Sequence, residues 1–235
     1  MKETIKNLGI KFFLTSYLKY KYNHKKPSDF VNERTLEYPY ILSELSRVKA
    51  NKILDIGSGR TSFPSTLESC GYDITASDLK GSYYKMFHNH HIHVVKDNIT
   101  RSRFSNESFD VITCISTLEH IPDFNVAINE MVRLLKPEGF LILTFPYQYD
   151  EFQDNVYELV DSNAYGNNSK FITRSYSDSE IHKWIDKHSL KKDKIAYYKG
   201  FEGKFWSTGK RINFPYWVDN KEVANGVCIT LKKEI

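Results

Sequence analysis

The chain has 235 residues, of which 40% are apolar and 14% aromatic, enough for one well-packed domain with an appended lid. Its 33 basic and 29 acidic residues give a formal charge of +4, which argues against the concentrated basic surface of a dedicated nucleic-acid-binding protein. The three cysteines, Cys70, Cys114 and Cys228, are odd in number and lie in apolar stretches. They favour buried, reduced thiols in a cytoplasmic protein over a disulfide framework.

Residues 1–50 are predicted to form an N-terminal helical segment. Its most apolar stretch, IKFFLTSYLKYKY at residues 10–22, is interrupted by Lys11 and has no small-residue cleavage site after it, so we do not expect it to be a signal peptide. It is also shorter than the ~20 apolar residues of a membrane-spanning helix. Nearby lysines leave binding to a membrane surface as an alternative, but a helix packed on the domain is favoured.

Beyond residue 50, short apolar runs alternate with helical patterns. Strands are predicted at 52–56, 73–78, 92–97, 109–116, 140–146, 194–198 and 226–231, because each run is apolar and bounded by turn residues. Helices are predicted from Ser62 and Pro64 to Gly71, over 122–135, and after the capping box Ser177–Glu180. This alternation indicates an α/β fold with a mostly parallel sheet covered on both faces.

The stretch LDIGSGRTSFP, residues 54–64, joins the first strand to the first helix. Gly57 and Gly59 fit the start of a dinucleotide-binding fingerprint, but Ser62 occupies the third glycine position, so the match is weak. Asp55 precedes Gly57 closely, and a carboxylate there would repel a pyrophosphate by ~1 to 4 kcal/mol at about 4 Å. A ligand with a cationic group and no phosphate is therefore favoured.

Several motifs in order along the chain resemble those of one superfamily. LDIGSGRT resembles the first motif of class I S-adenosylmethionine-dependent methyltransferases of the type 11 group, TASD their second-strand end, and VVKDN their third. SFDVITCISTLEHIPD and AINEMVRLLKPEGFLIL resemble their fourth and fifth strands with the helix between them. The similarity spans about Lys52 to Pro146, with Thr61 in place of the family's frequent third glycine.

This resemblance implies an α/β, doubly wound, mostly parallel seven-stranded Rossmann-like sheet in residues 51–235, with N-terminal helices, a lid insertion and antiparallel last strands. S-adenosylmethionine would be the cofactor. The residues implied to bind it are Asp55, Gly57, Ser58 and Gly59 for the methionine part, Asp78 and Leu79 for the ribose, Asp97 with Asn98 or Ile99 for the adenine, and Ser116 beside the sulfonium. A loop cap without a ligand is the alternative at the acidic positions.

Arg34 and Tyr38 lie in ERTLEYPYILSEL, residues 33–45, which resembles the segment before the first strand in some members of this superfamily. Arg34 would bind the carboxylate of the cofactor and Tyr38 would close over it. A surface ion pair between Arg34 and Glu37 or Glu33 is an equally good interpretation.

Methyl transfer requires a base only for some acceptors, because the cofactor supplies the electrophile. Glu119 and His120 follow the fourth strand and are the candidate catalytic residues, with His120 preferred because an imidazole titrates near neutrality. That the pair only fastens the following loop is a slightly favoured alternative. Weaker candidates for the base are Tyr147, Asp150, Tyr176 and His182.

Two segments outside the core motif, residues 147–180 and 200–225, are predicted to select the acceptor. The second holds a set of aromatic residues among lysines and an arginine, namely Phe201, Phe205, Trp206, Phe214, Tyr216 and Trp217. Such a composition suits the stacking of a sugar ring or nucleotide diphosphate. Packing of the lid against the sheet is the favoured alternative.

The histidine group HNHHIH, residues 88–93, invites a metal interpretation. No cysteine or carboxylate pattern completes a site of known spacing around it. We therefore predict a surface segment that binds no metal.

The favoured function is O-methylation of a small molecule, sugar or glycan, because STLEH stands after the fourth strand where amino-methylating DNA enzymes carry Asn/Asp-Pro-Pro-Tyr. Three alternatives stay open: an RNA methyltransferase using the lysine-rich N-terminus, an NAD(P)-dependent oxidoreductase, and a non-catalytic module that binds S-adenosylmethionine. A small-molecule or glycan acceptor is the predicted partner, and nucleic acid is disfavoured. Nothing in the sequence indicates an oligomeric state.

Overall fold

The computed structural model describes residues 31–59, 61–80, 94–167 and 171–234. The chain divides into a unit of Met1–Val31 and a compact unit of Asn32–Ile235. The predicted apolar helix at 10–22 and the histidine group at 88–93 lie outside the described residues. Within the described part, no helix is both long and apolar enough to cross a membrane.

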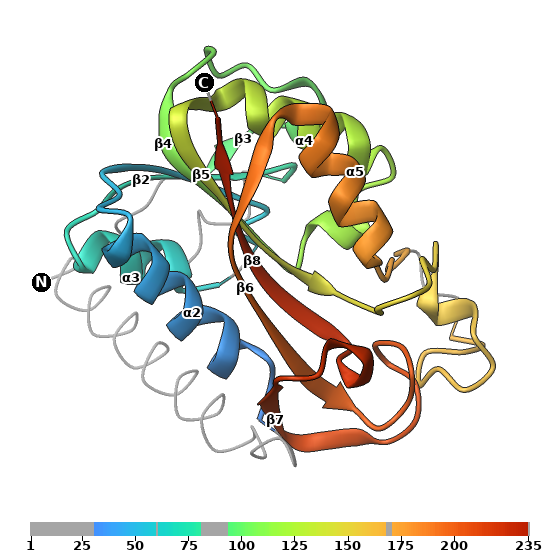
Figure 1. Ribbon diagram of the computed structural model, residues 1–235. Coiled ribbons are helices and arrows are strands. Elements are labelled where there is room, and N and C mark those ends of the chain that lie inside the picture. The colour runs from blue at the N-terminus through green and yellow to red at the C-terminus, as the bar shows by residue number, and fades with distance from the viewer. Residues whose placement is uncertain (1–30, 60, 81–93, 168–170, 235) are drawn as a thin grey trace, which may run out of the picture. The chain divides into compact units, whose positions relative to one another are not determined.

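Eight strands in the described part form one sheet, in the order β3-β2-β1-β4-β5-β8-β6-β7 (Figure 1). They are β1 (Lys52–Ile56), β2 (Asp73–Asp78), β3 (Val95–Lys96), β4 (Phe109–Ile115), β5 (Leu135–Pro146), β6 (Leu190–Phe201), β7 (Arg211–Val218) and β8 (Gly226–Lys233). Strands β1 to β5 pair in parallel. Strand β8 is antiparallel to both β5 and β6, and β7 is antiparallel to β6.

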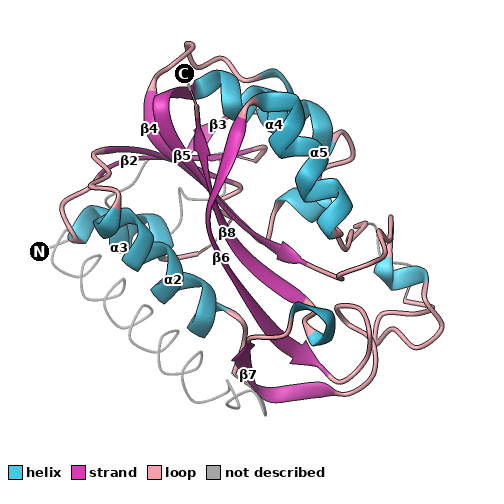
Figure 2. Cartoon of the chain, in the orientation of Figure 1, coloured by secondary structure: helices cyan, strands magenta, loops and turns pink. Residues whose placement is uncertain are grey.

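Helices cover both faces of the sheet (Figure 2). They are α2 (Arg34–Arg47), α3 (Phe63–Ser69), α4 (Phe124–Leu134) and α5 (Asp178–His188), with short 3-10 helices η2 (Ile99–Arg101), η3 (Leu118–His120), η4 (Val156–Glu158) and η5 (Lys221–Val223). The buried side chains form two main clusters, one with α2 and α3 and the other with α4 and α5. The buried strands between them therefore read as continuous apolar runs.

The sequence-based prediction of the fold is confirmed in its main features, with differences at the edges. In the described part of the chain the sheet has eight strands instead of seven, because β7 forms within the segment predicted as a lid. Strand β6 has the direction of the parallel strands, since it pairs with β8 in antiparallel. Strand β5 begins at Leu135, directly after α4. Leu135 pairs with Phe109 and Phe140 pairs with Val111, so residues 136–139 form a bulge between the two pairs.

The order of the strands places the candidate site. The chain passes from β1 to β2 and β3 on one side and then returns to β4 on the other side of β1. Ligands of open α/β sheets bind outside the carboxyl ends of the strands at such a reversal. The segments to examine are therefore the loops that follow β1 and β4.

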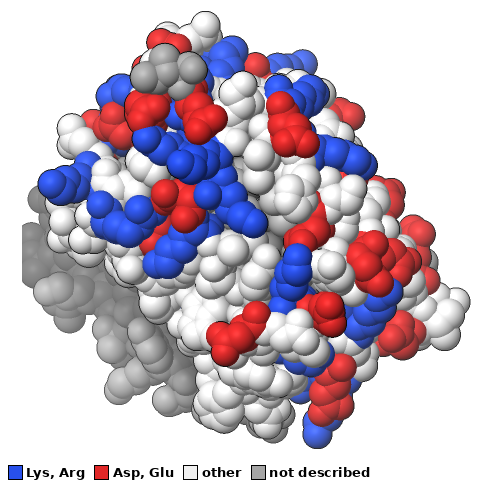
Figure 3. Space-filling view, in the orientation of Figure 1, with Lys and Arg blue, Asp and Glu red and all other residues white. Residues whose placement is uncertain are grey.

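Acidic and basic side chains are interspersed over the face of the molecule in Figure 3, with basic groups most frequent at the upper left. Among the described residues, some basic groups are paired with acids: Arg47 contacts Glu44 and Asp193, and Lys136 contacts Asp110. The visible face therefore has no continuous basic stripe of the kind that tracks a phosphate backbone.

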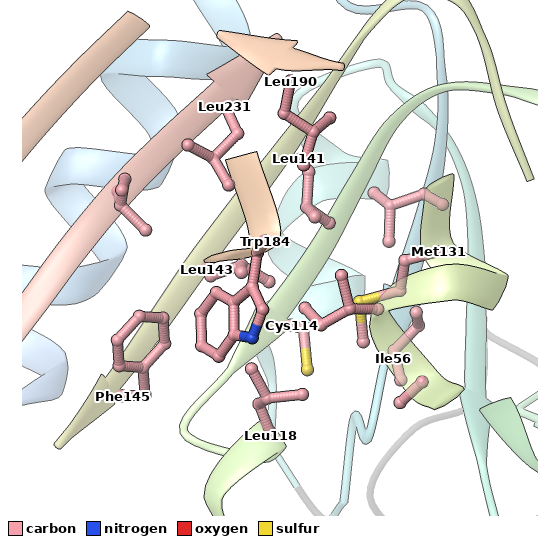
Figure 4. Close-up of a cluster of buried hydrophobic side chains, with 14 of the residues drawn as sticks. Ile56, Cys114, Leu118, Met131, Leu141, Leu143, Phe145, Trp184, Leu190 and Leu231 are labelled. Carbon is pink, nitrogen blue, oxygen red and sulfur yellow. The ribbon is translucent and has the colours of Figure 1, made fainter. Parts of the chain in front are cut away.

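The indole of Trp184 lies at the centre of the larger core, near Phe145, Leu118 and Cys114 (Figure 4). Its ring centroid is 5.7 Å from that of Phe145 and 5.1 Å from that of Tyr176. The side chain is 2% exposed, and its Nε1 is buried without a hydrogen-bond partner among the described residues. The contribution of this residue to stability is therefore one of packing.

We expect Trp184→Ala to lower the free energy of unfolding by about 3 to 5 kcal/mol, because the substitution leaves a large cavity. Trp184→Phe should cause a clearly smaller loss, since it keeps a ring and removes the unpaired Nε1. Urea denaturation of the two variants and the wild type measures both values. Equal losses in the two variants would contradict the packing role.

Candidate functional site

The turn after β1 requires glycine at its first position. Gly57 has φ +69° and Gly59 has φ +55°, in the left-handed region that favours glycine. A Cβ atom on Gly57 would lie 2.2 Å from Cγ2 of Thr117, in the loop after β4. The amide of Gly57 donates to the carbonyl oxygen of Ser77 at 2.9 Å. The turn is thus held tightly between the ends of β2 and β4.

The turn is less crowded at its second glycine: among the described residues, a Cβ atom on Gly59 would meet only the carbonyl oxygen of Gly57, at 3.7 Å. Below the turn lies Asp55, which is 2% exposed. Its Oδ1 accepts a hydrogen bond from Thr113 and its Oδ2 accepts one from Ser58, both at 2.7 Å. The carboxylate therefore faces the protein, and its charge lies beneath the turn.

Burial raises the pKa of Asp55 to about 6, against the hydrogen bonds from Thr113 and Ser58, which lower it. The group is therefore mainly ionised at neutral pH. The hypothesis that Asp55 attracts a cationic ligand stays a prediction, and in this structure the attraction would act through the turn.

Two further acidic residues lie at neighbouring strand ends. Asp78, the last residue of β2, accepts hydrogen bonds from the amides of Gly59 at 3.1 Å and Lys80 at 2.9 Å. The amide of Asp97 donates to the carbonyl oxygen of Asp78 at 3.1 Å, so the ends of β2 and β3 are adjacent. Leu79 is 62% exposed. Asp78, Leu79 and Asp97 thus form one rim at the adjacent ends of β2 and β3, and their predicted roles toward the ribose and the adenine stay predictions.

Local hydrogen bonds position the residues after β3. The carboxylate of Asp97 accepts from the amide of Arg103 at 3.2 Å. Asn98 is the N-cap of η2, since its Oδ1 accepts from the amide of Thr100 at 3.0 Å. Ile99 begins η2 and is buried. The part that the side chains of Asp97 and Asn98 play toward a ligand stays a prediction.

Helix α2 contributes side chains to the other side of the turn. Arg34 Nη1 donates to the hydroxyl oxygen of Ser116 at 2.8 Å and forms an ion pair with Glu37. Arg34 therefore has the predicted ion pair with Glu37, but the pair is not at the surface, because Glu37 is 0% exposed. The predicted role of Arg34 toward the carboxylate of the cofactor stays a prediction. Tyr38 stacks on Phe63, the first residue of α3, with ring centroids 4.5 Å apart. Helix α2 is thus fixed beside the glycine turn.

Glu119 and His120 lie on η3, directly after the end of β4. Glu119 is 3% exposed, and its Oε2 is buried without a hydrogen-bond partner among the described residues. Burial raises the pKa of Glu119 to about 8, so the group is largely protonated at neutral pH. His120 Nε2 lies 3.9 Å from Glu119 Oε1.

The other ring nitrogen of His120 is engaged by the lid. Nδ1 is 2.8 Å from the carbonyl oxygen of Ile172, and a carbonyl only accepts, so Nδ1 carries the proton of the neutral ring. Nε2 is therefore the atom that accepts. Burial lowers the pKa of His120. Both predicted roles of His120 fit this arrangement. Its Nδ1 holds the segment 147–180 through Ile172, as a loop-fastening role requires, and its Nε2 is able to accept a proton, as a catalytic base requires.

A pocket of about 170 Å³ brings several of these residues together. It is lined by Glu33, Arg34, Ser116, Glu119, His120, Pro146, Tyr157, Thr173, Tyr198 and Trp206. A hollow of about 210 Å³ lies at the opposite end of the sheet, next to Asp110 and Gly139 at the starts of β4 and β5. We assign the smaller pocket to function because it adjoins the carboxyl ends of the strands.

The weaker base candidates do not line this pocket. Tyr147 donates to Asp178 at 2.7 Å, and Tyr176 donates to the carbonyl oxygen of Leu118 at 3.0 Å. His182 contacts a backbone carbonyl on α5 at 2.8 Å. The hydroxyl and imidazole groups therefore stabilise the lid and α5.

Trp206 was predicted only as one of a set of aromatic residues that could stack a ring, and Tyr157, Thr173 and Tyr198 were not named as site residues. Tyr157 and Thr173 lie in the segment 147–180, which was predicted to select the acceptor without naming these positions. The ring centroids of Trp206 and Phe201 are 4.8 Å apart, and Phe201 and Phe205 are buried. The predicted packing is therefore confirmed for Phe201, Phe205 and Trp206, whereas Phe214, Tyr216 and Trp217 are exposed.

We expect Gly57→Ala to destabilise the protein by more than the ~1 to 2 kcal/mol of a left-handed backbone, because the new methyl group would displace Thr117. Gly71→Ala is the matched control, since Gly71 has φ +91° and no atom of the described residues lies within 4 Å of an added Cβ. Thermal unfolding of both variants measures the difference. Equal losses would show that the contact with Thr117 carries no weight.

Glu119→Gln should change how stability depends on pH. The folded-state pKa of Glu119 is raised to about 8 from 4.5. The contribution of the protonated group to stability is therefore complete below the pKa of 4.5 and is lost as the pH rises through the folded-state pKa of about 8. In that window the wild type loses up to ~1.4 kcal/mol per pH unit from this group. Glutamine does not ionise, so the variant should gain stability relative to the wild type as the pH rises through this window.

Urea denaturation at about pH 5, 7 and 9 tests this window. The contribution of Asp55 is common to both proteins and cancels in the difference. Parallel stability curves for the variant and the wild type would contradict a protonated Glu119.

Comparison with known proteins places this geometry among enzymes that transfer methyl groups. A family model described as "Methyltransferase domain" matches residues 54–143. The chain is 28% identical over 130 residues to the ubiquinone biosynthesis O-methyltransferase of Haemophilus ducreyi. The aligned region covers 51% of this chain and 54% of that protein. The protein of the same description from Pasteurella multocida is 25% identical over 196 residues, covering 73% of this chain and 79% of that one. The chain thus spans about half the length of the first relative.

Solved structures share the fold at low sequence identity. The 1,6-didemethyltoxoflavin-N1-methyltransferase of Burkholderia thailandensis, solved with S-adenosylhomocysteine, has a TM-score of 0.57 at 14% identity, covering 96% of this chain and 87% of that chain. A SAM-dependent methyltransferase of Methanosarcina mazei has a TM-score of 0.58 at 19% identity, covering 84% of this chain and 98% of that chain. The α/β fold predicted from the sequence is the fold of these proteins.

Proposed function

Because the chain belongs to the class I S-adenosylmethionine-dependent methyltransferase superfamily, we propose that it transfers a methyl group from S-adenosylmethionine to an oxygen of a small molecule, sugar or glycan. The loop after β4 carries this proposal. Thr117 contacts the glycine turn, while Ser116, Glu119 and His120 of the same loop line the pocket. Cofactor and acceptor sites would therefore meet at this loop.

The residues around the turn fit the cofactor. S-adenosylmethionine supplies an electrophilic methyl group on a cationic sulfur and carries an ammonium and a carboxylate. The charge of Asp55 beneath the turn would favour the cationic end. Asp78 and Asp97, on the adjacent rim, would accept hydrogen bonds from the ribose and the adenine. Arg34 would pair with the carboxylate.

His120 is the group that we assign to proton removal. Nε2 would accept the hydroxyl proton of the acceptor as its oxygen attacks, because Nδ1 already donates to Ile172. A neutral Glu119 beside Nε2 would not hold a proton on the imidazole as a carboxylate would. The lowered pKa of His120, caused by burial, keeps the ring neutral and able to accept.

The pocket supports a compact, hydroxylated acceptor group. Its volume of about 170 Å³ suits one ring or a short polar chain, and three hydroxyl-bearing residues, Ser116, Thr173 and Tyr157, line it. Trp206 offers a face on which a ring can stack. The two curated relatives described as O-methyltransferases support oxygen as the acceptor atom.

Calorimetric titration with S-adenosylmethionine, S-adenosylhomocysteine and NAD tests the cofactor. We expect the first two to bind and NAD to give no signal. Transfer of labelled methyl groups to phenols, sugars, glycans and RNA then tests the acceptor. NAD binding without response to the other two ligands would overturn the proposal, and labelling of RNA alone would replace the small-molecule acceptor.

His120→Gln tests the base within the same assay. The side chain keeps polarity but does not take up a proton, so kcat should fall on the order of 100-fold. The dissociation constant of S-adenosylmethionine should stay within about twofold of the wild type, because His120 lines the acceptor pocket. An unchanged kcat would limit His120 to fastening the lid.

A further inference from the structure

Helix α2 carries two fully buried glutamates, Glu37 and Glu44, each 0% exposed. Seven residues separate them, about two helical turns, so both face the sheet. Carboxylates are almost never fully buried unless they are paired. Each of these residues therefore requires a set of compensating partners.

The two glutamates have matching partners at opposite ends of the helix. Glu37 pairs with Arg34, three residues toward the start of α2, and Glu44 pairs with Arg47, three residues toward the end of α2. Each also accepts a hydrogen bond from a hydroxyl group of the sheet. For Glu44 this donor is Thr230, at 3.0 Å, and Lys194 adds a second ion pair at 2.8 Å.

Unlike the partners of Glu44, the partners of Glu37 line the pocket. Its Oε1 accepts hydrogen bonds from Ser116 at 2.9 Å and from Tyr198 at 3.1 Å. Arg34, Ser116 and Tyr198 all line the pocket, whereas Glu37 itself does not. One buried carboxylate thus holds three side chains of the pocket wall, which come from α2, the loop after β4, and β6.

Two of these partners need such support. Ser116 has φ +41°, a backbone conformation that non-glycine residues adopt only where the surroundings enforce it. Arg34 uses only Nη1 for its hydrogen bonds with the described residues, to Glu37 and Ser116. Its Nε and Nη2 are therefore left for a planar anion such as a carboxylate.

We propose that Glu37 is a positioning residue at the boundary between the acceptor pocket, which Arg34 and Ser116 line, and the proposed cofactor site beside the glycine turn: it holds the guanidinium of Arg34 and the hydroxyl of Ser116 in the geometry that binds S-adenosylmethionine. This inference rests on the proposed function. Glu37 acts through its partners and does not touch the ligand. Glu44, on the same helix, has the matching structural role without a neighbouring site.

Glu37→Gln is the test variant and Glu44→Gln its matched control. Both substitutions keep the size of the side chain and remove one buried charge from α2. The dissociation constant and KM of S-adenosylmethionine are measured at a temperature at which wild type and both variants are folded by circular dichroism. We expect Glu37→Gln to raise both constants about tenfold, a loss typical of one charge-assisted contact, and Glu44→Gln to leave both within about twofold.

Thermal unfolding of the same samples separates positioning from general stability. Similar losses of melting temperature in the two variants, with weakened binding only in Glu37→Gln, would support the proposal. Equal affinity of Glu37→Gln and wild type would overturn it while leaving the proposed function intact. Equal weakening in both variants would overturn it as well, because stability would then explain the loss. A wild-type protein that binds no S-adenosylmethionine would overturn the proposed function itself.

Tyr198→Phe provides a second variant if Glu37→Gln does not fold. It removes the hydroxyl group that donates to Glu37 and keeps the ring. We expect the dissociation constant of S-adenosylmethionine to rise about two- to fivefold, because a neutral donor contributes less than a charged one. An affinity equal to that of the wild type would contradict a network that positions Arg34 and Ser116.

Discussion

The hydrogen bonds of the buried Asp55 carboxylate hold the site together. One oxygen accepts from Thr113 on β4 and the other from Ser58 in the glycine turn, so a single side chain joins two strands and the loop between sheet and helix. Without these donors, burial of the charge would be strongly unfavourable. Because β1 and β4 are aligned in this way, the loop after β4 closes against the turn, and the acceptor pocket forms beside it.

Features with a local cause were predictable from the sequence. The glycines of the turn, the buried strands and the helix at Ser177 follow from backbone freedom, apolar runs and capping, and Ser177 does accept from the amide of Glu180. The order of the motifs was enough to identify the superfamily. Arg34, Ser116, Glu119 and His120 were also named in advance, and the structure brings all four to one pocket.

Features that depend on distant parts of the chain were not predictable. Glu37 looked like a surface partner of Arg34, yet it is buried by Tyr198, which lies 161 residues away in sequence. Trp206 lines the pocket and packs against Tyr198 and Phe201 of β6. The orientation of Asp55 depends likewise on Thr113, 58 residues further on. Spacing within a motif carries no information about such contacts.

The position of β8 has a consequence for how the molecule assembles. This strand follows all the others in sequence but lies between β5 and β6. During synthesis, the facing edges of β5 and β6 therefore stay unpaired until residues 226–233 have been made. Open edges of this kind recruit other strands, and pairing over long sequence separation is slow. The nascent chain is thus most exposed to aggregation just before its sheet is complete.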